Sequence, residues 1–124
     1  MKFYICAHCG NIVTYVKDAG VPVMCCGEKM QEIVPGTVEA SAEKHLPVLT
    51  VEGSRVTVRV GSAEHPMLAE HSIEWIALET REGHQFKALA PERKPEAVFV
   101  LAEGDAAVAA YAYCNLHGLW KTEA

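Results

Sequence analysis

A cysteine and a histidine near the C-terminus are the residues best suited to chemistry. Cys114 and His117 are three positions apart, beside a glycine, and they follow a run of β-forming residues. A thiolate and an imidazole that converge on a turn can bind a transition metal together. Three further histidines lie upstream in short motifs: His45, His65 and His71. We therefore predict that the fold brings these five side chains together around one redox metal.

The upstream histidines are expected at strand ends or in loops. His45 precedes an apolar run, His65 is followed by the stiff residue Pro66, and His71 lies at the entrance of an expected strand. A lone histidine is more often structural or solvated than a ligand, so the prediction depends on the whole set. His84 lies in a turn without such neighbours, and we expect it at the surface.

The ligand types narrow the choice of metal without settling it. Imidazole and thiolate together suit iron, copper or zinc, and three imidazoles with one thiolate would suit closed tetrahedral zinc. Four imidazoles and one thiolate are too many for that geometry. They suit an octahedral metal with one open position, where a small molecule can bind.

A second cluster of cysteines occupies the beginning of the chain. Cys6 and Cys9 are followed by a glycine, and Cys25 and Cys26 are adjacent and also followed by a glycine. About 36 residues bury too little apolar surface to fold unaided, so this segment needs a metal or disulfides. Cysteines in a reducing compartment favour the metal, which four sulfurs would bind as zinc or iron. His8 is expected to be solvated, since four thiolates already saturate the metal.

Composition places limits on the partners and the compartment. The chain has 124 residues, of which 50% are hydrophobic, and its net charge is -5. The acidic balance argues against a nucleic acid or an anionic membrane as partner. The sequence has no apolar run of membrane-spanning length and no signal-peptide core at its start, so we expect a cytoplasmic protein.

The pattern of apolar residues predicts an all-β protein in two parts. Residues 1–36 form the cysteine-rich part, with short strands at 3–5 and 11–16. Residues 37–124 begin with a polar link and continue with alternating and buried strand patterns, which predict an antiparallel β-sandwich of about seven strands. The expected strands are 48–51, 56–60, 72–79, 84–89, 97–101, 108–113 and 119–121.

The combined motifs resemble desulfoferrodoxin, the two-iron class of superoxide reductase. They run from residue 6 to residue 118: Cys6-x-x-Cys9-Gly10, Cys25-Cys26-Gly27, Glu43-Lys44-His45, His65-Pro66-Met67, His71-x-Ile73-Glu74-Trp75 and Cys114-Asn115-Leu116-His117-Gly118. The resemblance implies a small desulforedoxin-like domain at 1–36 and an immunoglobulin-like β-sandwich at 37–124. It also implies a cytoplasmic homodimer that receives electrons from rubredoxin.

The resemblance assigns a role to each motif. A rubredoxin-like iron would be bound by Cys6, Cys9, Cys25 and Cys26, and a second iron by His45, His65, His71, His117 and, axially, Cys114. The second iron, in its ferrous form and with an open sixth position, would reduce superoxide to hydrogen peroxide and so detoxify it. Lys44 would attract the anion, and Glu43 would close the open position on the oxidised iron.

Three other functions are compatible with parts of the pattern. An electron carrier would use only the first iron and would not react with superoxide. A zinc-stabilised binding module would be colourless and would need a basic face. A superoxide dismutase would release oxygen as well as peroxide, whereas a reductase releases no oxygen from superoxide and needs an electron donor.

Overall fold

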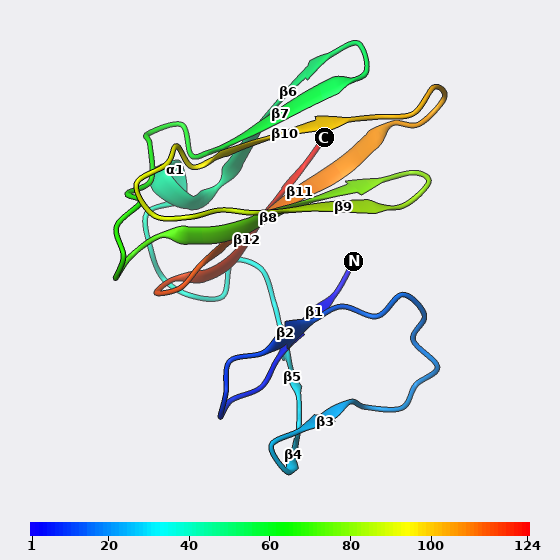
Figure 1. Cartoon of the computed structure of the whole chain (residues 1–124), viewed down its shortest axis with the longest axis vertical. Coiled ribbons are helices and arrows are strands. Elements are labelled where there is room, and N and C mark those ends of the chain that lie inside the picture. Colours follow the sequence, from blue (N-terminus) through cyan, green and yellow to red (C-terminus); the bar gives the residue numbers. More distant parts are fainter. The chain divides into compact units, whose positions relative to one another are not determined.

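The computed structural model describes residues 1–124 and divides into two compact units, Met1–Val34 and Pro35–Ala124. We call them the head and the body. Nearly all of the regular structure is β-strand (Figure 1). The single helix has four residues, so no helix of this chain has the length and apolar character to cross a membrane.

The head contains two small antiparallel sheets. One has three strands in the order β2-β1-β5, and the other is the hairpin β3-β4. Their bounds are β1 Phe3–Ile5, β2 Ile12–Val13, β3 Met24–Cys25, β4 Glu28–Lys29 and β5 Gln31–Ile33. The strand predicted at 11–16 is shorter than expected, and β3 to β5 were not predicted, because strands of two or three residues show no readable alternation.

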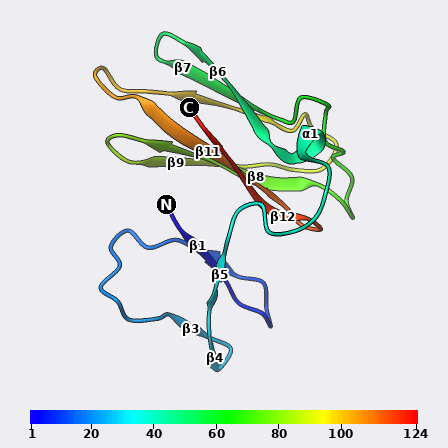
Figure 2. The same cartoon turned by 180° about the vertical axis from the view of Figure 1, so that it is seen from behind.

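The body is a sandwich of two antiparallel sheets (Figure 2). One sheet has the order β10-β7-β6 and the other the order β12-β11-β8-β9. The strands are β6 Pro47–Glu52, β7 Arg55–Val60, β8 Ile73–Thr80, β9 His84–Ala88, β10 Glu96–Val100, β11 Ala107–Cys114 and β12 Gly118–Glu123. This confirms the prediction of an all-β fold with a seven-strand sandwich.

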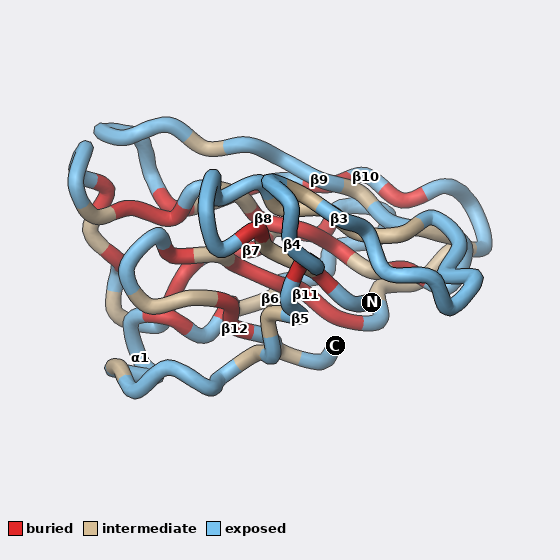
Figure 3. Tube along the Cα trace, turned by 90° about the horizontal axis from the view of Figure 1, so that it is seen from below, coloured by how far each residue is buried: buried red, intermediate tan, exposed pale blue.

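Alternation along the strands places the body's core between its two sheets. In β7 the side chains of Val56, Val58 and Val60 are fully buried, while Arg55 and Arg59 are exposed. Residues of both sheets form one apolar cluster, and Figure 3 shows buried segments in the central strands. The alanine-rich β11 pairs with strands on both sides, which confirms that it is a strand rather than a helix.

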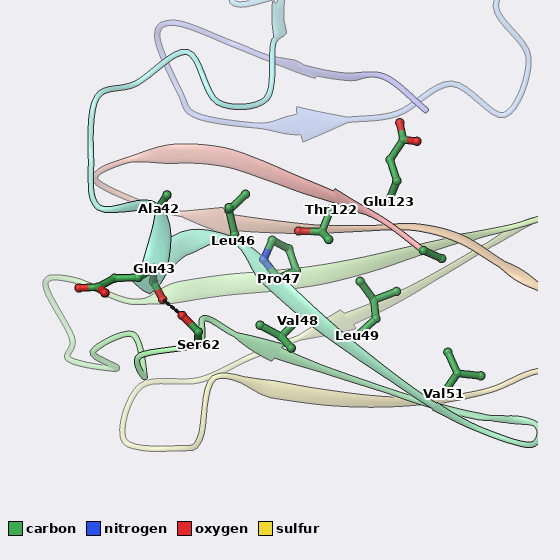
Figure 4. Close-up of a pocket in the computed structure, with 11 residues that line it drawn as sticks. Ala42, Glu43, Leu46, Pro47, Val48, Leu49, Val51, Ser62, Thr122 and Glu123 are labelled. Carbon is green, nitrogen blue, oxygen red and sulfur yellow. Dashed lines mark hydrogen bonds between the residues drawn. The ribbon is translucent and has the colours of Figure 1, made fainter.

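The helix α1, Ala42–His45, was not predicted. It is a single turn, too short for a helical period to be read, and its N-cap residue Ser41 makes no side-chain capping hydrogen bond. Its position is fixed by its backbone: the Glu43 carbonyl accepts hydrogen bonds from the Ser62 hydroxyl at 3.2 Å and the Ala63 amide at 2.9 Å (Figure 4). These bonds hold α1 against the start of the β7–β8 loop.

Gly61 allows this close approach. It is buried, and a Cβ atom placed on it would lie 2.8 Å from the carbonyl carbon of Lys44 and closer still to the carbonyl oxygen of Glu43. Both atoms belong to the backbone and cannot rotate away. Any larger residue at position 61 must therefore push α1, and the histidine at its end, out of place.

The variant Gly61→Ala is expected to lower the free energy of unfolding by about 1–3 kcal/mol, the usual cost of overpacking. Urea unfolding of the purified protein measures the change. Gly83→Ala is the matched control, because a Cβ at position 83 would meet no atom within 4 Å. Equal stability of the two variants would contradict the steric argument.

Candidate metal centres

Five ligand side chains of the body come from four separate segments. His45 ends α1, His65 and His71 lie in the loop between β7 and β8, Cys114 ends β11, and His117 lies in the turn before β12. The antiparallel pairing of β11 with both β8 and β12 joins the segments that carry His71, Cys114 and His117. Strand ends thus support the histidines and the cysteine, as the sequence predicted.

The donor atoms of these residues converge. One nitrogen each of His45, His65 and His71 and the sulfur of Cys114 all lie within 4.8 Å of one another. His117 joins the group through its Nδ1, which is 3.1 Å from Nε2 of His45 and 3.9 Å from Sγ of Cys114. The structure therefore brings all five predicted ligands to one place.

The four imidazole rings are arranged in a circle, which we call the circuit, in which each ring contacts the next one edge to face. His45 and His65 meet edge to face with centroids 4.7 Å apart, and His65 and His71 do the same at 4.7 Å. His71 and His117 follow at 5.2 Å, and His117 and His45 close the circuit at 4.9 Å. Four nitrogens on such a circuit, with one sulfur beside them, form a donor set for a metal of high coordination number.

Hydrogen bonds at the outer nitrogens determine which inner nitrogens carry lone pairs. Nδ1 of His45 lies 2.7 Å from the carbonyl oxygen of Ser41, and Nδ1 of His65 lies 2.6 Å from that of Pro66. A carbonyl only accepts, so both Nδ1 atoms donate and both Nε2 atoms are unprotonated. These two Nε2 atoms are 3.2 Å apart.

This geometry fits a bound cation. Two lone pairs that face each other at such a distance repel unless a cation lies between them. In addition, Nε2 of His71 is buried and has no hydrogen-bond partner. A metal site requires imidazole nitrogens that converge on one point and have no other hydrogen-bond partner. In such sites the second nitrogen of each ring usually donates a hydrogen bond, often to a backbone carbonyl.

Burial prepares the protonation states that a metal needs. Loss of solvent lowers the pKa of His45 and lowers that of His65 to about 4, so both rings are neutral near pH 7. Burial also raises the pKa of the Cys114 thiol, against the opposing effect of the Leu116 and His117 backbone amides. Imidazoles bind metals in the neutral form, and a cation would draw the proton from the thiol.

The head brings its four cysteines together in a second group. The sulfurs of Cys6, Cys9, Cys25 and Cys26 all lie within 4.8 Å of one another, and none of these residues forms a disulfide. Cys6 is buried, whereas Cys9 and Cys26 are exposed. Cys26 has a φ of 52°, in the left-handed region, because adjacent residues must both turn their sulfurs toward one point.

Without a cation, four thiols in contact cannot all lose their protons, because the resulting thiolates would repel one another. Backbone amides of Cys9 and His8 lower the pKa of Cys6 to about 6, whereas hydrogen bonds with the neighbouring sulfurs raise that of Cys26 to about 12. A bound cation would remove this conflict, and a set of four sulfurs suits iron or zinc. His8 is exposed and lies 3.1 Å from Glu28, so it does not belong to the cluster.

Glu43 and Lys44 lie on α1, immediately before the ligand His45, and both are exposed. Figure 4 shows the carboxylate of Glu43 extending away from the groove between β6 and β12. That groove has a volume of about 550 Å³ and is lined by none of the five ligands. Glu43 and Lys44 are therefore at the molecular surface, next in sequence to the ligand His45.

Two supporting residues were not identified from the sequence. The indole nitrogen of Trp120 donates to the carbonyl of His117 at 3.0 Å, and its ring lies 5.1 Å from that of His45. Asn115 links the two ligand-bearing loops by side-chain hydrogen bonds. Asn115 lies inside the motif that carries Cys114 and His117, which is the signal that points to it, whereas the Trp120 contacts depend on the folded chain.

Comparison with known proteins agrees with both groups. The family model described as desulfoferrodoxin matches residues 37–123. A desulfoferrodoxin of Nitratidesulfovibrio vulgaris is 44% identical over 123 residues, which cover 99% of this chain and 96% of that protein. The crystal structure of the superoxide reductase from Treponema pallidum is 40% identical, covers 98% of both chains and gives a TM-score of 0.84.

A superoxide reductase of Giardia intestinalis described as 1Fe-SOR is also similar. It is 32% identical, with a TM-score of 0.57, and covers 66% of this chain and 97% of that one. The present chain therefore matches a relative of its own length as well as a shorter one. With its four-sulfur group, its group of histidines and cysteine, and these similarities, the chain belongs to the desulfoferrodoxin family of superoxide reductases.

Proposed function

We propose that this protein is a superoxide reductase that converts superoxide into hydrogen peroxide with an electron supplied by a donor protein. The observation that carries this proposal is the convergence of four imidazoles and one cysteine sulfur, all in the body. In the same proposal residues 1–36 are the desulforedoxin-like domain and residues 37–124 the reductase domain.

The residues of the body divide the work between binding and steering. His45, His65, His71, His117 and Cys114 would hold an iron, which when ferrous supplies the electron that superoxide accepts. The sulfur of Cys114, once ionised by the bound iron, would bring negative charge to the site and would favour the higher oxidation state of the iron. Glu43 is the carboxylate that we propose would bind this iron once it is oxidised.

Lys44 is the proposed cation for the substrate. Superoxide is an anion, and the chain carries a net charge of -5, so the overall field opposes its approach. Lys44 is exposed and next in sequence to the ligand His45. Its ammonium group would attract superoxide locally and hold the solvent that donates the two protons that hydrogen peroxide requires.

The head would hold the second iron through Cys6, Cys9, Cys25 and Cys26. The exposure of Cys9 and Cys26 leaves this site near the surface, where a donor protein can approach. We propose rubredoxin as the donor, a homodimer as the assembly and the cytoplasm as the compartment, where free thiols persist. Removal of superoxide would be the physiological role.

The reaction is tested by its products. We expect the reduced protein, mixed with superoxide from pulse radiolysis, to yield one peroxide for each superoxide consumed and no oxygen from it. An oxygen electrode and a peroxide assay measure both products. Oxygen released in an amount equal to the peroxide would identify a dismutase and overturn the proposal.

Substitution of one cysteine in each group should remove one metal. Cys26→Ser is expected to lower the iron content from two to one per chain and to leave the head susceptible to protease, because so small a unit depends on its metal. Cys114→Ser should instead abolish the thiolate-to-iron absorption of the body and leave that of the head. Elemental analysis with absorption spectra distinguishes the two, and an unchanged iron content in Cys26→Ser would exclude that ligand.

Removal of the charge of Lys44 should slow the reaction. Lys44→Ala is expected to reduce the rate of association with superoxide by about 10-fold and to flatten its dependence on ionic strength. Lys87→Ala is the matched control, since it removes an equal charge from the exposed strand β9. Pulse radiolysis at several salt concentrations measures both, and equal rates for the two variants would reject local steering.

A further inference from the structure

Asn115 connects the loop of His71 to the turn that carries Cys114 and His117. Its side-chain oxygen accepts a hydrogen bond from the Ser72 amide at 3.0 Å, and its side-chain nitrogen donates to the Glu70 carbonyl at 3.0 Å. Its backbone amide also donates to the Ser72 carbonyl, at 3.3 Å. The three bonds therefore engage the residues on both sides of His71.

These bonds continue a sheet where the strands stop pairing regularly. The pairing of β11 with β8 shifts register between Tyr113 and Cys114, and the last pair is Cys114 with Ile73. Beyond that pair the side chain of Asn115 makes the two hydrogen bonds that a facing peptide group would make. A carboxamide suits this position because it carries one acceptor and one donor in a plane, as a peptide does.

The opposite side of the His71 backbone is held separately. The amide of Leu68 donates to the His71 carbonyl at 2.9 Å, and the His71 amide donates to the Leu68 carbonyl at 3.2 Å. Leu68 thus fixes the turn itself, and the Asn115 side chain fixes that turn to the segment of Cys114 and His117. Without Asn115, one imidazole of the circuit would lose its side-chain connection to the sulfur ligand.

We propose that Asn115 is a positioning residue that presets the distance between His71 and the ligands Cys114 and His117 before the metal binds. The inference rests on the proposed function only in that the body site holds a metal. The reason is geometric: the side-chain hydrogen bonds of Asn115 join the residues on both sides of His71 to the segment that carries Cys114 and His117. A site assembled in advance spends less of the binding energy on ordering its loops.

The exposure of Asn115 makes the proposal testable. Asn115 is exposed and lies outside the apolar cluster, so Asn115→Ala leaves no cavity in the core. Asn115→Asp keeps the acceptor for the Ser72 amide and loses the donor to Glu70. We therefore expect a graded effect, largest for the alanine variant and intermediate for the aspartate variant.

The experiment is a competition for ferrous iron on the full chain. Iron-loaded wild type and variants are titrated with a ferrous chelator under anaerobic conditions, and the absorption bands of the body and the head are followed separately. Asn115→Ala is expected to weaken iron binding in the body by about 10–100-fold, the usual cost of losing a residue that supports a ligand. The head should be unaffected.

Asn11 provides the matched control, as the other asparagine of the chain. Its side-chain nitrogen lies 3.8 Å from the sulfur of Cys25, so Asn11→Ala should affect only the head. Unfolding measurements on the metal-free and iron-loaded proteins distinguish a residue that positions the ligands from one that only stabilises the fold. A positioning role predicts a larger loss of stability in the iron-loaded chain than in the metal-free chain, because the loss of affinity adds to it.

The outcomes decide the proposal. Unchanged iron affinity in Asn115→Ala overturns it, as does an equal loss of stability with and without iron. Neither result depends on superoxide, so a failure of the proposed reaction would leave the iron titration interpretable. Conversely, weakened iron binding in a protein that evolves oxygen from superoxide would support the positioning role and reject the reductase.

Discussion

The body depends on a repulsion that its fold imposes. Nε2 of His45 and Nε2 of His65 both carry lone pairs and lie 3.2 Å apart, because the carbonyls of Ser41 and Pro66 fix the protons on the far side of each ring. Such an arrangement is unfavourable in an empty site and favourable around a cation. The folded sandwich must therefore be stable enough to keep the two nitrogens close together despite this repulsion.

The strand ends supply this stability through backbone contacts rather than through the ligands. The Glu43 carbonyl is held by Ser62 and Ala63, which places α1, and Gly61 leaves the space for it. The indole of Trp120 holds the carbonyl of His117. The segments of His45 and His117 are thus held by hydrogen bonds to neighbouring segments of the body.

The strands of the body and the ligand residues could be predicted from the sequence wherever an alternation or a motif was long enough to recognise. The alternation of Val56, Val58 and Val60 predicts β7, and the motifs predict which side chains meet. Shorter features could not be predicted: α1 has one turn, and β3 has two residues, so neither has a readable period. The tautomers of the histidines depend on carbonyls such as that of Ser41, whose direction only the folded backbone determines.

The two groups of metal ligands differ in how well the surrounding protein can fold without the metal. The body contains an apolar cluster drawn from both sheets, and the ligand Cys114 belongs to that cluster. The head buries little besides Phe3, Cys6 and Met30, and its strands are two or three residues long. Folding of the body can therefore precede metal binding, whereas folding of the head is coupled to it.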